Sequence, residues 1–182
     1  MLARSDVGGV VLDHTTADEA AMREDRSVST SFTVTPIGRV ESERADPIDD
    51  DWGDVVATIR LDEQRFGPDV LAGLADFSHV EVLFLFDRVD EGSVELSARH
   101  PRGNRDWPLV GIFAQRAKGR PNRLGSTTCE LVAVDELAVR VRGLDAIDGT
   151  PVLDLKPYVR EFGPRGPIAQ PAWIGELMQR YW

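Results

Sequence analysis

The 182-residue sequence offers little sulfur chemistry and no long apolar segment. Its single cysteine, Cys129, cannot form an intrachain disulfide, and the apolar residues around it predict a buried thiol. No run of eighteen apolar residues occurs, so no membrane-spanning helix is predicted. The first residues also lack the basic start and apolar stretch of a signal peptide. These absences favour a cytoplasmic protein that acts without a membrane, and the length suits one domain with its own core.

Lysine is scarce as well, because only Lys118 and Lys156 of the 21 basic residues are lysines. The net charge of −10 argues against a general nucleic-acid binder. Residues 99–123, however, contain seven basic residues and only one acid, Asp106. Arginine presents a planar fork of donors that suits carboxylate and phosphate groups. This segment therefore predicts a local site for an anionic ligand or an RNA segment, with a solvated arginine-rich loop as the alternative.

Several common catalytic motifs are missing. The sequence has no glycine-rich dinucleotide or phosphate loop and no Gly-x-Ser-x-Gly motif. Its three histidines, His14, His79 and His100, are far apart. His79 and Glu81 share one face of a predicted strand, but no third ligand accompanies them, so no metal site is predicted.

The order of elements predicts a mainly β fold. Residues 1–30 lack sustained periodicity and are expected to form a disordered N-terminal tail. Alternating or apolar segments predict strands at residues 32–40, 55–61, 78–89, 109–114, 124–134, 137–144 and 152–155. The segment 78–89 is apolar on both faces, as in a strand buried on two sides. Because no strand–helix–strand alternation occurs, these strands favour a closed or strongly curved antiparallel sheet.

The remaining segments predict few helices and one long loop region. Residues 62–74 suit a short helix that Gly67–Pro68 interrupts or starts. A short amphipathic helix near the C-terminus is predicted by four apolar residues at helical spacing, Ile174, Leu177, Met178 and Tyr181. Residues 41–53 form a polar, aspartate-rich loop in which Trp52 is expected to be exposed. Residues 99–124 are rich in glycine and proline, and a loop region of this length is usually functional or disordered.

Two segments concentrate polar side chains in patterns that suit a site. Arg116, Arg120 and Asn122 lie on a loop that Pro121 stiffens, and a rigid loop of fork donors is what anion positioning requires. Asp154 and Lys156 are two residues apart, so a strand places them on the same face. Such a pair is either a surface ion pair or part of a site.

Four motifs, in this order and spacing, resemble the TsaA-like family over residues 32–158. They begin with Phe77-Ser78-His79, His100-Pro101-Arg102-Gly103, Gly111-Ile112-Phe113-Ala114 and Gly143-Leu144-Asp145. The fourth continues through Asp148-Gly149-Thr150-Pro151 and ends in Asp154-Leu155-Lys156-Pro157-Tyr158. The known enzyme of this family is a tRNA methyltransferase that uses S-adenosylmethionine (SAM). It acts on the N6 atom of threonylcarbamoyl-adenosine beside the anticodon.

The resemblance implies a single-sheet closed β-barrel that acts as a homodimer, with SAM near the dimer interface. The barrel domain would cover residues 31–160, and residues 161–182 would form a linker and a C-terminal helix. Carried over by motif, the SAM-binding residues are Asp51, Phe86, Asp87, Arg116, Leu124, Asp148, Gly149, Thr150 and Pro151. The candidates for catalysis on the acceptor side are Asn122, Asp154, Lys156 and Tyr158. The candidates for holding the anticodon arm of tRNA are Arg102, Arg120 and Arg123.

The sequence departs from the family pattern at two loop positions. Gln115 stands where the tRNA enzymes commonly have threonine, and Arg123 stands where they have proline. The larger tRNA enzymes also carry an additional C-terminal domain. The first hypothesis is therefore N6-methylation of threonylcarbamoyl-adenosine in tRNA. Methylation of a small-molecule acceptor and non-catalytic SAM binding remain as alternatives, and the general base is left open between Asp154, Tyr158 and water.

Overall fold

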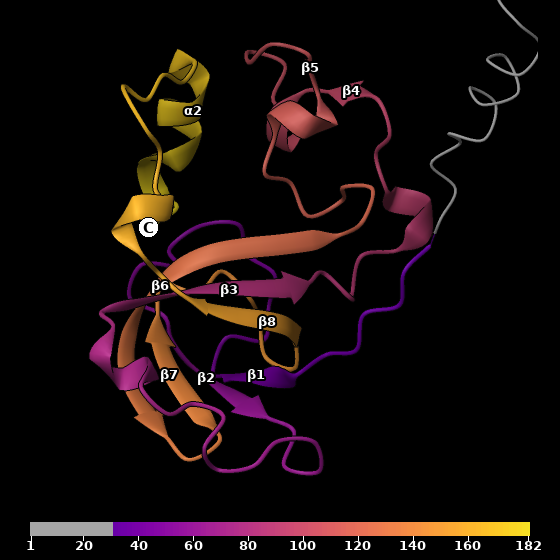
Figure 1. The fold of residues 1–182 in the computed structure, drawn as a ribbon. Helices are drawn as coiled ribbons and strands as arrows, with labels where there is room; N and C mark the ends of the chain where they lie inside the picture. Colours follow the sequence, from indigo (N-terminus) through magenta and orange to yellow (C-terminus); the bar gives the residue numbers. More distant parts are fainter. Residues whose placement is uncertain (1–30) are drawn as a thin grey trace, which may run out of the picture. The chain divides into compact units, whose positions relative to one another are not determined.

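Six antiparallel strands close into a barrel in the computed structural model, which describes residues 31–182 (Figure 1). The strands are β1 (Gly38–Ser42), β2 (Val56–Leu61), β3 (His79–Leu85), β6 (Leu124–Asp135), β7 (Ala138–Arg142) and β8 (Pro151–Pro157). They follow the order β1-β2-β7-β6-β3-β8, and β8 pairs with β1 to close the sheet. The predicted mainly β, single-sheet closed barrel is thereby confirmed. Residues 1–30, predicted as a disordered tail, lie outside the described residues.

The barrel closes around a core made by alternate residues of its strands. In β3, the side chains of Val80, Val82 and Phe84 are fully buried, whereas the residues between them are only partly covered or exposed. The other strands add apolar side chains to the same interior, namely Val40, Ala57, Ile59, Leu61, Cys129, Val139, Val141 and Val152. Burying one such aliphatic side chain contributes about 1.5–3 kcal/mol, so this interior is the main source of stability. Cys129 belongs to it, as predicted.

Two glycines allow the strands to approach closely enough for closure. A Cβ atom added at Gly38 would lie 2.1 Å from the backbone oxygen of Arg60 on the neighbouring strand β2. A Cβ atom added at Gly125 would lie 2.3 Å from the ring of Phe84, the largest fully buried side chain. Neither position has room for a side chain, so glycine is required at both.

The helices are short and lie outside the barrel strands. The 3-10 helices are η1 (Leu74–Asp76), η2 (Glu91–Ser93), η3 (Pro101–Gly103), η4 (Ile112–Ala114), η5 (Arg160–Phe162) and η6 (Met178–Arg180), and α2 spans Ala172–Leu177. The predicted C-terminal helix is present as α2 and η6. The helix predicted at residues 62–74 is wrong, because this segment forms successive turns that end in η1. Pro68 lacks an N–H group and disfavours a helical Gly67, so helix cannot continue from the first turn.

Several predicted strands are shorter than expected, and the one predicted at residues 78–89 ends at Leu85, so that residues 86–89 lie beyond the sheet. The first begins at Gly38, so residues 32–37 precede it without strand pairing. The segment 109–114 contributes only β5 (Val110–Gly111), which pairs with β4 (Ala98–Arg99) in a small separate sheet. Directly after Gly111 the chain turns into η4, in which Ile112 is buried.

Three connections meet at one end of the barrel, which we call the loop end. They are residues 43–55 between β1 and β2, residues 86–123 between β3 and β6, and residues 143–150 between β7 and β8. The opposite end carries residues 62–78, the two-residue β6–β7 turn and the chain beyond β8. None of the helices among residues 31–182 is long and apolar enough to cross a membrane.

Candidate functional site

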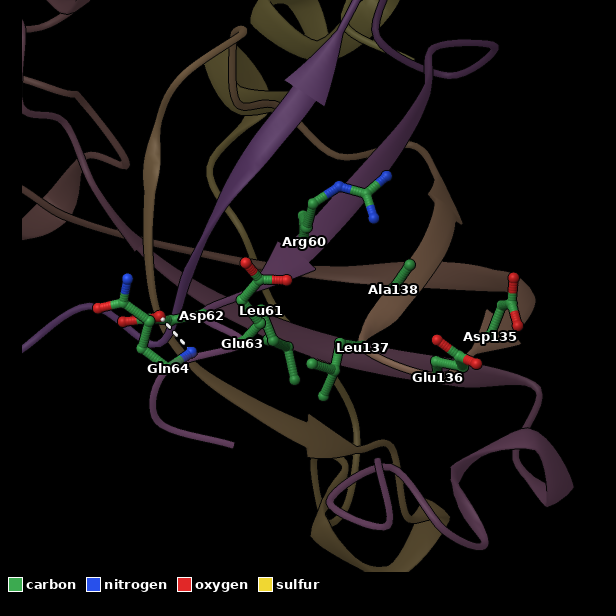
Figure 2. Close-up of a pocket in the computed structure, with 9 residues that line it drawn as sticks. All are labelled: Arg60, Leu61, Asp62, Glu63, Gln64, Asp135, Glu136, Leu137 and Ala138. Atoms are coloured by element: carbon green, nitrogen blue, oxygen red, sulfur yellow. Dashed lines mark hydrogen bonds between the residues drawn. The ribbon is translucent and has the colours of Figure 1, made fainter. Parts of the chain in front are cut away.

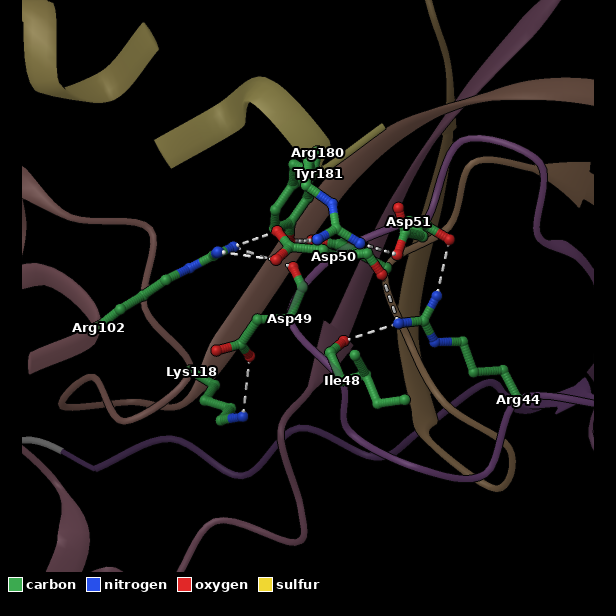
Figure 3. Close-up of polar contacts among 10 residues, drawn as sticks. Arg44, Ile48, Asp49, Asp50, Asp51, Arg102, Lys118, Arg180 and Tyr181 are labelled. Atoms are coloured by element: carbon green, nitrogen blue, oxygen red, sulfur yellow. Dashed lines mark hydrogen bonds and ion pairs between the residues drawn. The ribbon is translucent and has the colours of Figure 1, made fainter. Parts of the chain in front are cut away.

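The loop between β1 and β2 is organised around Arg44. Its guanidinium donates to the backbone oxygens of Ile48, Asp50 and Asp51 at 2.9, 2.6 and 2.8 Å (Figure 3). The same group lies 3.6 Å from the ring centroid of Trp52. The expectation that Trp52 is exposed is therefore wrong, since this side chain is only 4% exposed. The cation–π contact with Trp52 and the hydrogen bonds from Arg44 to backbone oxygens hold this polar loop in one conformation.

Three aspartates of this loop pair with cations from three different segments. Asp50 binds Arg102 of η3 through two contacts of 2.8 and 3.1 Å. Asp49 lies 3.2 Å from Lys118, and Asp51 lies 3.3 Å from Arg180 of η6 (Figure 3). The basic segment predicted to hold an anion therefore already has internal carboxylate partners. The Arg102–Asp50 pair is the most enclosed of the three, with about a quarter of each side chain exposed.

The loop that leads into β6 is fixed by contacts with backbone oxygens. Arg123 donates to the oxygen of Val89 at 2.9 Å, and Arg120 donates to the oxygen of Gln115 at 3.3 Å. Arg123 has a φ of 52°, which proline cannot adopt, so the departure from the family pattern reflects a different local backbone. Asn122 is exposed beside it.

Gln115, the second departure, has a structural role. Its side chain is only 7% exposed, and its amide donates to the oxygens of Arg99 and Val110 at 3.1 and 3.0 Å. These two bonds hold the β4–β5 sheet to the loop. Gln115 therefore does not face a ligand, and its presence carries no information about the acceptor.

The turn before β8 is held in place from two sides. The Asp148 carboxylate accepts a hydrogen bond from the Ser42 N–H at 3.0 Å, and the Arg88 guanidinium donates to the backbone oxygen of Asp148 at 3.0 Å. Gly149 has a φ of 79°, a conformation that favours glycine, and Thr150 is buried. Asp148 is thus fixed beside the end of β1 with one carboxylate oxygen left without a partner among residues 31–182.

The predicted SAM-binding residues gather mainly at the loop end. Phe86 follows β3, and its N–H donates to the Arg123 oxygen at 2.8 Å. The Phe86 ring packs edge-on against Phe84 at 5.2 Å between centroids. Leu124, at the start of β6, is 45% exposed. Asp87, Asp51 and the turn at residues 148–151 lie on the three connections that meet there.

A polar strip crosses the outer face of β6, β3 and β8. Arg116 donates to the Ser126 oxygen, and the Ser126 hydroxyl donates to Glu81 at 3.0 Å. Glu81 is paired in register with Lys156, which forms an ion pair with Asp154. The hydrogen bond with Asp154 raises the pKa of the exposed Lys156 ammonium. The strip connects one predicted SAM residue, Arg116, with two predicted acceptor residues.

Sequence reasoning missed two members of this strip. Glu81 was considered only as a metal ligand, and Ser126 was not considered. The available signal was the charge of Glu81, which is isolated among apolar residues of β3. Its partner Ser126 is separated from it by 45 residues, so only the β3–β6 register brings the two side chains together.

Tyr158 lies apart from the loop end. It follows β8, its N–H donates to the His79 oxygen at 3.0 Å, and its ring lies 6.5 Å from that of His79. Pro151 begins the same strand, and seven residues of extended chain at ~3.3 Å each separate the two by roughly 23 Å. The structure thus does not bring Tyr158 to the turn at residues 148–151 within one chain.

A partly buried polar cluster joins the barrel mouth to the C-terminal residues. Asp145 accepts one hydrogen bond from the Thr127 hydroxyl and another from the Tyr181 hydroxyl. Burial, followed by the charge of Asp145, raises the pKa of Tyr181 far above its usual value. Burial likewise raises the pKa of Cys129 to about 12, and Asp145 adds to this shift. None of these roles was predicted, because the partners come from distant segments.

Of two hollows in the surface, one lies away from the loop end and the other lies beside its β1–β2 connection. One of about 470 Å³ lies at the end opposite the loop end (Figure 2). It is bordered by Arg60, Leu61, Asp62, Glu63, Gln64, Asp135, Glu136, Leu137 and Ala138. A second, of about 810 Å³, lies beside β1 and β2 and includes Arg44. None of the predicted site residues borders either hollow.

Relatives of the chain are tRNA methyltransferases and SAM-binding proteins. The tRNA (adenine(37)-N6)-methyltransferase of Escherichia coli is 40% identical over 97 residues, which cover 50% of this chain and 40% of that protein. A probable S-adenosyl-L-methionine-binding protein of Methanothermobacter thermautotrophicus is 39% identical over 98 residues, covering 54% of this chain and 67% of that protein. The matched region spans only 21% of the mouse tRNA (adenine(37)-N6)-methyltransferase.

The barrel also matches a solved structure. A crystal structure of TrmO from Pseudomonas aeruginosa superposes with a TM-score of 0.59 and 30% identity, covering 72% of this chain and 58% of that one. The family model of the tRNA-methyltransferase O N-terminal domain matches residues 40–163. That range contains all six barrel strands except the first two residues of β1, together with the loop end and the polar strip. The resemblance of the motifs is confirmed, and the chain belongs to the tRNA-methyltransferase O N-terminal domain family.

Proposed function

We propose that this chain is a SAM-dependent methyltransferase that methylates the N6 atom of threonylcarbamoyl-adenosine in tRNA. The observation that carries this proposal is the joining of the loop end to the acceptor-side strip through Arg116. Relatives named as tRNA (adenine(37)-N6)-methyltransferases support the reaction, and one named as a SAM-binding protein supports the cofactor. The absence of a long apolar helix among residues 31–182 is compatible with a cytoplasmic site of action.

The chemistry of the loop end fits SAM. Among residues 31–182, the Arg116 side chain makes one hydrogen bond, to the Ser126 oxygen, so its remaining donors suit the carboxylate of the ligand. The free oxygen of Asp148 suits the ribose hydroxyls. Exposed Leu124 and the neighbouring Phe86 suit the adenine ring, and Asp51, Asp87 and Gly149–Pro151 complete the walls. SAM supplies an activated methyl group, so this chain mainly provides alignment, which is worth roughly 7–11 kcal/mol.

The acceptor side is assigned to Asn122, Asp154, Lys156 and Tyr158. The N6 amine carries a proton that must leave, and Asp154 and Tyr158 are the candidate bases, with water as the third. The ion pair with Lys156 orients the Asp154 carboxylate. Of the two side chains, Asp154 is the nearer to Arg116, because it lies opposite Leu83 in the middle of β3.

A homodimer accounts for two features of the outer barrel face. The outward side chains Leu83 and Leu85 of β3 are only half-buried in one chain. Tyr158, 39% exposed, lies roughly 23 Å along β8 from the turn that begins it. A second copy placed on this face would cover the apolar side chains and bring its own residues to the site. This supports the homodimer that the family resemblance implies.

The anticodon arm of tRNA is assigned to the basic segment. Arg102, Arg120 and Arg123 lie on the long connection at the loop end, and Arg105 adds a further cation. Phosphate contacts of arginine release counterions, so affinity for tRNA should fall steeply with salt. A flat salt dependence of turnover would instead indicate a small acceptor.

The decisive experiment is nucleoside mass spectrometry of bulk tRNA after incubation with the protein and methyl-labelled SAM. The tRNA should come from cells that lack the gene, so that acceptor sites are empty. Label in threonylcarbamoyl-adenosine is the expected result. If SAM binds but no nucleoside becomes labelled, tRNA methylation is refuted, and a small-molecule acceptor or a binding role takes its place.

A further inference from the structure

The C-terminal residues fasten the two connections on which the proposed SAM site depends. The Tyr181 hydroxyl donates to one oxygen of Asp145, while the Thr127 hydroxyl of β6 donates to the other. Asp145 lies three residues before Asp148 in the connection between β7 and β8. Because both carboxylate oxygens are engaged, this connection is tied to β6 on one side and to Tyr181 on the other.

The same C-terminal residues bind the β1–β2 connection through the backbone. The Asp51 N–H donates to the Arg180 oxygen at 2.7 Å, and the Trp52 N–H donates to the Tyr181 oxygen at 2.8 Å. The approach is so close that a Cβ atom on Gly53 would lie 2.7 Å from the backbone of Trp182. Asp51 itself has a φ of 61°, an uncommon conformation that needs such support.

The Tyr181 hydroxyl is suited to donate a hydrogen bond to Asp145 at every physiological pH. The phenol is partly buried, and the raised pKa keeps the hydroxyl protonated throughout the physiological range. A neutral donor against a carboxylate forms a strong charge-assisted hydrogen bond. Arg116 lies close enough for its charge to act on this phenol, so the cluster borders the residue assigned to the SAM carboxylate. Figure 3 shows Tyr181 and Arg180 beside Asp50 and Asp51.

We propose that Tyr181 is a positioning residue of the SAM site, which fixes Asp145 and the turn at residues 148–151 against the loop at residues 50–53. This inference rests on the proposed function. Both walls of the site are then fixed before SAM binds. The Tyr181 hydroxyl holds the connection that contains Asp145, and the Tyr181 backbone oxygen holds the loop that contains Trp52. Preorganisation of this kind increases affinity by lowering the ordering cost of binding.

The test compares Tyr181→Phe with the parent protein by calorimetry and steady-state kinetics. Loss of one hydrogen bond to a charged group should weaken SAM binding about tenfold and raise the KM for SAM to match. The kcat at saturating SAM should change by less than about twofold, because Tyr181 does not touch the reacting atoms. Asp145→Asn, which keeps the shape, should have a similar effect on SAM binding. The double variant should bind no more weakly than Asp145→Asn alone, because the hydrogen bond that Tyr181→Phe removes is then already disrupted.

The matched control is Trp107→Phe. It removes the hydrogen bond from the Trp107 indole to Glu176 of α2, at 2.8 Å, which fastens the same C-terminal segment without touching either SAM wall. Its dissociation constant for SAM should be unchanged. A parent protein that does not bind SAM would refute the proposed function and this inference together. A parent that binds SAM, with Tyr181→Phe and Asp145→Asn both within about twofold of it, would overturn only the positioning role.

Discussion

The two ends of the barrel differ in how their connections are held. At the loop end, three connections and the C-terminal residues are joined by carboxylate–cation pairs, by arginine contacts to backbone oxygens and by the Asp145 cluster. At the other end, the β6–β7 turn has two residues, and the Arg60–Glu41 ion pair joins two adjacent strands, not two connections. An acidic hollow bordered by residues such as Glu63 and Asp135 lies at that end (Figure 2).

This difference indicates which end carries the function. Short turns connect strands at little cost, so long connections that are internally fastened need another reason to exist. The ordered polar contacts at the loop end immobilise several long side chains, which costs conformational entropy that barrel closure alone does not require. A hollow, by contrast, forms wherever strands diverge and does not by itself indicate a ligand. Four predictions test this contrast, from the largest expected effect to the smallest.

Arg116→Ala should have the largest effect, on SAM affinity. A charged hydrogen-bonding partner of the ligand is worth about 1.5–3 kcal/mol, so the dissociation constant should rise roughly 10- to 100-fold. Calorimetric titration with SAM measures this directly. The matched control is Arg60→Ala at the other end, where the guanidinium pairs with Glu41 at 2.7 Å. Equal losses of SAM affinity in Arg116→Ala and Arg60→Ala would mean that the loop end has no special role in SAM binding.

Lys156→Ala should separate binding from turnover. Lys156 lies on the outer strip and pairs with Asp154, away from the loops assigned to SAM. We expect kcat to fall about tenfold or more, while the dissociation constant for SAM stays within about twofold. Single-turnover kinetics with methyl-labelled SAM separates the effect on methyl transfer from the effect on SAM binding. Loss of SAM binding in this variant would show that the strip belongs to the SAM site rather than the acceptor side.

The fold was readable from the sequence where local patterns carry it. Alternation and apolar runs located the barrel strands, and the ordered motifs located the loop-end residues from Phe86 to Pro151. Local patterns failed where distant contacts decide the structure. Trp52 was expected to be exposed because its neighbours are polar, but Arg44 and the C-terminal residues bury it. The basic segment seemed free because its carboxylate partners, Asp50 and Asp49, lie 52 and 69 residues earlier in the chain than Arg102 and Lys118.

Cys129 lies in the barrel interior between the two ends. The pH dependence of stability tests whether burial and Asp145 of the loop end act on its thiol. Its folded pKa of about 12 exceeds the ordinary value of 9.0, because of burial and then Asp145. The folded state therefore keeps a proton that the unfolded state releases. The stability that the protonated thiol contributes to the folded state is fully present below pH 9 and is lost as the pH rises toward 12. Between pH 8 and pH 10, denaturant unfolding should show a loss of about 1.4 kcal/mol that Cys129→Ala lacks. Identical losses in both proteins would contradict the buried thiol.

Asp50→Asn should produce the smallest effect, and in the opposite direction. Asp50 neutralises Arg102 through a two-point contact, so the carboxylate occupies the position that an RNA phosphate would take. Removing its charge should free Arg102 for a phosphate, raise the affinity for an anticodon stem-loop a few-fold and steepen the salt dependence by about one unit of log K per log salt. Fluorescence anisotropy over a salt series measures both quantities.

The control for Asp50→Asn is Glu41→Gln, which removes the same charge from an exposed pair with Arg60. Both variants change the net charge equally, so a general electrostatic effect would raise RNA affinity in both to the same extent. Only a direct exchange of carboxylate for phosphate steepens the salt dependence in Asp50→Asn alone. Equal behaviour would mean that the acidic loop acts by its charge and not by its contact with Arg102. In that case the loop end would differ from the other end in packing only, and the phosphates of tRNA would have to be placed elsewhere on the chain.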